Sequence, residues 1–132
     1  MKGRPTRRAL NTRLAEAGLT LDASYGAASN DPAGLILATW IEDAAFVSVQ
    51  AVLNARTVLE FDLAIIDSPL PPPVLDRIVA AAQRAAKELP SLGRTALEVR
   101  KGQLGRSGAA SGAALLLIYE RLFSRELVHL AE

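Results

Sequence analysis

The sequence contains no cysteine and a single histidine, His129. Without cysteine the chain forms no disulfide, offers no thiolate to a metal and has no cysteine nucleophile, which fits a reducing compartment. With one histidine, a protein zinc site is not expected either. Aromatic residues make up only 5% of a chain that is 50% hydrophobic. This composition favours closely packed helices over a large aromatic pocket.

An excess of one charge and long apolar runs are also missing. The net charge is +1, so no overall field would draw nucleic acid or an anionic membrane to the molecule. Uninterrupted apolar runs stay below the roughly 18 residues of a membrane-spanning helix, and no apolar signal core follows the basic N-terminus. We therefore expect a cytoplasmic protein without a membrane partner.

A third of the basic residues lie near the N-terminus, at Lys2, Arg4, Arg7, Arg8 and Arg13. One interpretation is an arm that grips phosphates. A solvated helix face, or a chain opened by truncation, is favoured because no aromatic or recognition-helix pattern accompanies the cluster. Nucleic acid is thus not expected to bind this portion.

The stretch Phe61 to Val79 combines a strand, a tight exit and the start of a helix. Leu63 to Ile66 is a short continuous apolar run, typical of a parallel strand covered on both faces. Asp67 and Ser68 follow at its carboxyl end, where open α/β sheets place their ligand crevice. This is where we first expect a functional site.

The remaining pattern predicts helices over about 6–17, 31 to 54 or 57, 71–89 and 107–127, a half-exposed strand over 95–100, and a loop over 19–30. Thr6 and Asp31 are candidate N-caps, and Gly18 is a candidate stop signal. The chain divides into a basic helix and loop (1–30) and an α/β lobe (31–132).

Both strands are expected to lead into helices that cover a small sheet. Two strands leave their edges open, which predicts a missing half, a strand donated by a neighbour, or a tight dimer. An exposed Phe46 would mark a subunit contact, and a packed neighbour in the same chain is the alternative.

The turn Gly102–Gly108 resembles a phosphate-binding turn in composition, but it lacks the Lys-Ser/Thr pair of a Walker A loop. The favoured alternative is tight packing of the last helix against the sheet. Ser111 lies in no nucleophile elbow, and the adjacent Glu42 and Asp43 point to different sides of a helix. Asp67 is expected to cap the following helix, or the turn before it, or to contact a ligand, because a carboxylate at a buried strand end needs a partner.

Three segments together resemble one known family. The first is the long helix carrying Trp40, Ala44 and Ala45, which leads into FDLAIIDSPLPPPVLDRIV; the second is LEVRKGQLG, and the third is GAASGAALLL. Their order and spacing resemble the C-terminal half of the repressor/open-reading-frame/kinase (ROK) family of sugar kinases and sugar-responsive transcriptional regulators. Residues 6–22 resemble more faintly the helix that follows the zinc segment of that family.

The resemblance implies an α/β fold, a helix-rich lobe with a small sheet like the C-terminal half of an actin-like ATPase (ribonuclease H-like) domain. It would place five residues along the nucleotide side of the cleft: Asp67, Ser68, Gly105, Gly108 and Gly112. Ser68 stands where the family often has glycine. The phosphate-binding segment, the catalytic aspartate and the zinc motif of the family have no counterpart here, so this chain supplies no catalytic residue and no metal site.

We therefore expect a ROK-type lobe or truncated member that is not catalytic alone. The alternatives are one half of an active ATP-dependent sugar kinase completed by another chain, and a dimerising regulatory module. The partners implied are a second copy or a partner lobe, together with a nucleotide or sugar. ATP with Mg²⁺ enters through the resemblance alone. The sugar, and the choice between kinase and repressor lineage, stay open.

Overall fold

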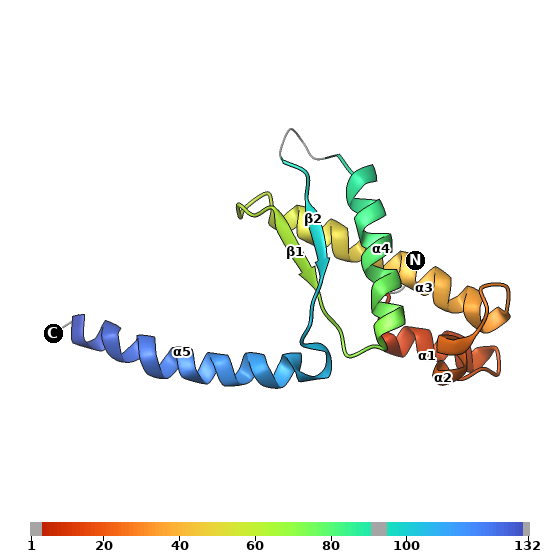
Figure 1. The fold of residues 1–132 in the computed structure, drawn as a ribbon, viewed down its shortest axis with the longest axis horizontal. Helices are drawn as coiled ribbons and strands as arrows, with labels where there is room; N and C mark the ends of the chain where they lie inside the picture. The colour runs from red at the N-terminus through yellow and green to blue at the C-terminus, as the bar shows by residue number, and fades with distance from the viewer. Residues whose placement is uncertain (1–3, 91–94, 131–132) are drawn as a thin grey trace.

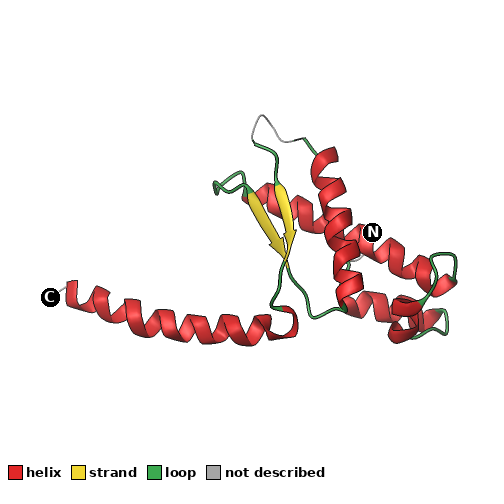
Figure 2. Cartoon of the chain, in the orientation of Figure 1, coloured by secondary structure: helices red, strands yellow, loops and turns green. Residues whose placement is uncertain are grey.

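The computed structural model describes the backbone of residues 4–90 and 95–130, with side chains up to Leu122. The chain is a helix-rich α/β protein in which helices cover one face of a small parallel sheet and the last helix extends away from it (Figures 1 and 2). The elements in order are α1 (Arg7–Glu16), α2 (Leu21–Gly26), α3 (Pro32–Ala55), β1 (Leu63–Ile66), α4 (Pro72–Glu88), β2 (Glu98–Lys101), the 3₁₀ turn η1 (Gly105–Ser107) and α5 (Gly108–Leu130).

The first helix begins and ends at the predicted signals. The Thr6 hydroxyl accepts a hydrogen bond from the Ala9 N–H at 3.1 Å, and Gly18 adopts a positive φ of 72° just beyond the end. The prediction of a loop over 19–30 was wrong in part, because α2 lies within it. Thr20 caps α2 by accepting a hydrogen bond from the Ala23 N–H. The loop was predicted because glycine and serine residues in this stretch were given more weight than this capping signal.

The long helix α3 forms the centre of the core. Its buried residues pack with Leu10 and Leu14 of α1, so α1 shares one core with the α/β lobe. The Trp40 indole N–H also donates to the Thr6 carbonyl at 3.1 Å. Asp31 was expected to cap α3 through its side chain, but its carboxylate makes no capping hydrogen bond.

Neighbouring helices contact different sides of α3. Glu42 pairs with Arg84 of α4 at 2.7 Å, and Asp43 pairs with Arg13 of α1 at 3.7 Å. In the described part of the chain, α3 alone is long and apolar enough to cross a membrane, but the core helix of a soluble protein passes the same test. Phe46 is exposed, and whether it marks a subunit contact stays a prediction.

The two strands run parallel, as predicted, with Leu63 opposite Glu98 and Ile65 opposite Arg100. One face of the sheet packs on the core through Val99 and Ile66. The other face is open, because Leu63 and Ile65 are 40% and 64% exposed. The prediction of a strand covered on both faces was therefore wrong for the described structure.

The last helix does not cover the sheet, contrary to expectation. From the carboxyl ends of the strands, α5 runs away from α3 and α4 (Figure 1). Among the described elements, its extensive contacts are confined to the adjoining turn η1. The small residues of its first turns therefore do not serve close packing. A Cβ added at Gly112 would meet no atom within 4 Å.

Candidate functional site

Asp67 fastens the turn that follows β2 to the end of β1. One carboxylate oxygen, Oδ2, accepts a hydrogen bond from the Leu104 N–H at 2.9 Å. The other, Oδ1, accepts from the Ser68 N–H at 2.9 Å and from the Gly105 N–H at 3.1 Å. Asp67 thus caps the start of η1, whose Leu104 N–H lies 37 residues away in the sequence. It does not cap α4, as had been expected. We call this set of hydrogen bonds the Asp67 latch.

The latch requires glycine at position 102. A Cβ built on Gly102 would lie 2.4 Å from the Cβ of Asp67 and 2.5 Å from its Cγ, far inside van der Waals contact. Gly102 also donates its N–H to the Ile66 carbonyl at 2.8 Å, which extends the sheet by one bond. The prediction that the glycine turn packs the last helix tightly against the sheet was therefore wrong, because the close contact is between Gly102 and the Asp67 side chain.

A hollow of about 480 Å³ opens beside the latch, at the carboxyl ends of both strands. Its lining includes Asp67, Ser68 and Gly105, so three of the five predicted site residues come together. Gly105 has a positive φ of 53° that favours glycine. Gly108 begins α5 beyond this lining, and Gly112 lies one turn further along the helix.

The chemistry of the hollow follows from which polar groups are already engaged. Asp67 accepts hydrogen bonds on both oxygens, and the N–H groups of Leu104 and Gly105 point at its carboxylate. These N–H groups are therefore not available to cradle a phosphate in this conformation, and the carboxylate would repel one. The other polar residues in the lining are Ser68, Gln103 and Lys101.

Two of these groups are also held in place. The Ser68 hydroxyl accepts a hydrogen bond from the Leu70 N–H at 3.3 Å, which leaves its own O–H as a donor. Lys101 pairs with Asp76 of α4 at 2.6 Å. No group of three or more acidic or histidine residues that could hold a metal ion occurs among the described residues. The hollow thus suits a ligand with hydroxyl or amide groups.

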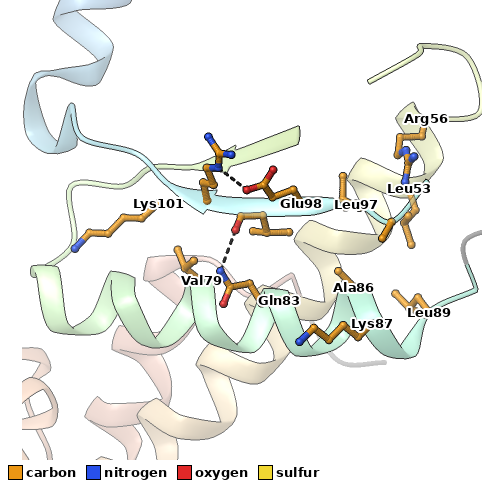
Figure 3. Close-up of a pocket in the computed structure, with 13 residues that line it drawn as sticks. Leu53, Arg56, Val79, Gln83, Ala86, Lys87, Leu89, Leu97, Glu98 and Lys101 are labelled. Atoms are coloured by element: carbon orange, nitrogen blue, oxygen red, sulfur yellow. Dashed lines mark hydrogen bonds and ion pairs between the residues drawn. The ribbon is translucent and has the colours of Figure 1, made fainter. Parts of the chain in front are cut away.

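A second hollow, of about 700 Å³, lies along the free edge of β2 and was not predicted from the sequence (Figure 3). Glu98 donates its N–H to the Asp62 carbonyl and Gly102 donates its N–H to the Ile66 carbonyl, both on the side of β1. The N–H and carbonyl of Val99 therefore point to the opposite edge of β2, which no strand pairs among the described residues. The Gln83 side chain crosses from α4 and donates to the Val99 carbonyl at 3.0 Å. The sequence pattern does not indicate this contact, because Gln83 stands among the polar residues of α4 and not in its apolar stripe.

Three of the cations at this second hollow, Arg56, Arg100 and Lys101, are held by neighbouring acidic groups. Arg100 and Glu98 lie 2.6 Å apart on the exposed side of β2 (Figure 3), and the hydrogen bond to Glu98 raises the pKa of the Arg100 guanidinium. The buried Arg56 donates to the Thr95 carbonyl at 2.8 Å and to Asp62 at 3.3 Å. These pairs explain the local structure and indicate no catalytic group.

Comparison with known proteins adds no relative. The chain matches no protein-family model, no curated protein and no solved structure. Residues of the site are therefore assigned from the geometry alone.

Proposed function

We propose that this chain is the C-terminal lobe of a ROK-type sugar kinase or sugar-responsive regulator, which forms one wall of a nucleotide cleft and is not catalytic by itself. The observation that carries the proposal is the convergence of Asp67, Ser68 and Gly105 at the carboxyl ends of two parallel strands. Ligands of open α/β sheets bind at this edge.

The proposed roles follow from the hydrogen bonds. Asp67 is a positioning residue, because its carboxylate is occupied by the N–H groups of the two turns. Ser68 and Gln103 would bind hydroxyl or amide groups of the nucleoside. Lys101 would neutralise a phosphate that reaches over the rim of the hollow. The opposite wall, with the groups that hold γ-phosphate and Mg²⁺, would come from a second lobe.

Isothermal titration with ATP and ADP tests the proposal. The chain is titrated alone and together with a separately produced N-terminal lobe of a ROK sugar kinase. We expect nucleotide affinity that appears or strengthens at least about tenfold when the second lobe is present, because one wall buries only part of a ligand. Lys101→Met should weaken binding in the pair, whereas Lys87→Met, on the outer part of α4, should not. Nucleotide binding to neither sample would contradict the proposal.

The same samples distinguish the proposal from its alternative, in which the chain is half of an active kinase. ADP release from ATP in the presence of a sugar, dependent on both lobes, would favour that alternative. Nucleotide binding without ADP release would favour a regulator. Amino sugars are the first substrates to assay, since hexose recognition lies in the proposed lineage.

A further inference from the structure

The helix α5 carries apolar side chains that no described element covers. Leu115, Leu117 and Leu122 are 63%, 65% and 61% exposed, and Leu116 and Ile118 are 59% and 52% exposed. Four consecutive apolar residues point in four directions around a helix, a pattern typical of helices that are buried on several sides. In proteins, most of the stability of a helix comes from packing its apolar face against a neighbour. The helix therefore needs a surface to pack against.

The same chain carries an apolar surface that lacks a helix. Leu63 and Ile65 lie on the sheet face opposite α4, and both are exposed. On β2 the same face carries the Glu98–Arg100 pair. In α/β proteins each face of a parallel sheet is normally covered by helices. One chain thus presents both halves of a helix-on-sheet contact, and leaves both unused.

The Asp67 latch explains why α5 does not cover its own sheet. It fixes the Leu104 and Gly105 backbone against the end of β1, and η1 then directs α5 away from the body (Figure 1). While the latch is closed, the open sheet face is available to another molecule. A second copy offers a suitable helix, because its α5 also extends away from its own body and is not packed on its own sheet.

We propose that two copies of this chain form a dimer by exchanging α5, each helix lying across the Leu63–Ile65 face of the other copy. The five large aliphatic residues of α5 (Leu115, Leu116, Leu117, Ile118 and Leu122) expose roughly 500 Å² per chain, comparable to the largest apolar patch of a typical monomer. Covering half of that surface in two symmetrical contacts buries roughly 1,000 Å² in total, which is the lower bound for a specific interface. The inference does not depend on nucleotide binding, so its failure leaves the proposed function intact.

Sedimentation equilibrium of the full chain is the first test. The wild type should have twice the chain mass of 14.0 kDa. Ile65→Lys should weaken the dimer by about 100-fold, because it removes one buried isoleucine from each of the two contacts. Val58→Lys is the matched control, since Val58 is 85% exposed and lies outside the sheet face. Circular dichroism confirms that both variants keep the helical content of the wild type.

Two results of this test would overturn the proposal. The first is a wild-type chain that stays monomeric at every concentration. The second is a dimer that Ile65→Lys and Val58→Lys leave equally intact, because the helix would then pack elsewhere. A loss of dimer in Ile65→Lys and in Leu117→Lys, which changes α5 instead of the sheet, supports it from both sides.

Cross-linking distinguishes exchange from closure within one chain. The sequence has no cysteine, so every engineered thiol is unique. A tagged Ile65→Cys chain is mixed with untagged Leu115→Cys, Leu116→Cys, Leu117→Cys or Ile118→Cys chains, which sample all sides of α5. A disulfide between tagged and untagged chains for one of the four, and none with a Val58→Cys partner, supports exchange. Disulfides that form only within one chain carrying both substitutions would show that α5 folds onto its own sheet, and would overturn the proposal.

Discussion

Replacing Asp67 by alanine removes an acceptor shared by three backbone N–H groups, those of Ser68, Leu104 and Gly105. Hydrogen bonds to a charged group contribute about 1.5–3 kcal/mol each when they are buried. Asp67 is exposed, and water can solvate the released N–H groups, so the three bonds together contribute about 2 kcal/mol to the free energy of unfolding. Asp67→Asn keeps one acceptor oxygen and should cost about half as much.

Urea unfolding followed by circular dichroism measures this loss. With a slope of about 1–1.5 kcal/mol per molar urea for a small domain, Asp67→Ala should lower the midpoint by about 1.5–2 M. The matched control is Asp76→Ala, which breaks an exposed ion pair with Lys101 and should cost no more than about 0.5 kcal/mol. Equal midpoints for the two alanine variants would refute the role of Asp67 as a latch.

Three further predictions concern single side chains. Gly102→Ala should destabilise by more than about 2 kcal/mol because its Cβ would collide with Asp67, whereas Gly112→Ala, in open space within α5, should raise helicity by circular dichroism. Burial raises the pKa of Tyr25 above 10.0, so the stability that it contributes is present below pH 10 and falls as pH rises further. Tyr25→Phe should reduce that fall in thermal melts and, since the Arg7 guanidinium offsets part of the cost of burying the hydroxyl, should change the stability by no more than about 1 kcal/mol at pH 7. Arg56→Leu should lower the urea-derived unfolding free energy by about 2–3 kcal/mol, because the Thr95 carbonyl loses a buried charged donor; a smaller loss than for Asp76→Ala would contradict that role.

Local signals in the sequence were sufficient to locate the main helices. The Thr6 cap and Gly18 bound α1, and the Asp31-Pro32 start and apolar pattern predict α3 to within a few residues. Such signals depend on atoms within one turn of helix, which the sequence places near one another. The missed helix α2 shows the limit, because its Thr20 cap and its glycine and serine content point in opposite directions.

Contacts between distant segments were not predictable in the same way. An apolar run identifies β1 as a strand, but it carries no information on whether a helix lies on each face. A parallel strand was predicted from the apolar run Leu63 to Ile66, whereas Asp67 and Gly105 were placed on the same side of a cleft only through the family resemblance. The groups that bind Asp67 were not predicted, since the Leu104 and Gly105 N–H groups exist in every sequence and are positioned only by the fold.

The latch also links the hollow to the proposed dimer, which gives a last prediction. While Asp67 holds η1, α5 points away from its own sheet, and the sheet face stays open to a second copy. Asp67→Ala releases the start of α5, so the helix can fold back onto Leu63 and Ile65 of the same chain, where the contact is intramolecular and therefore favoured at low concentration. Sedimentation should then show a shift from dimer to monomer. Hydrogen exchange should show that the β1 amides stay protected, because Leu63 and Ile65 are still covered by a helix. If Asp67→Ala remains dimeric with wild-type affinity, the direction of α5 does not depend on the latch, and the explanation for exchange fails at that step.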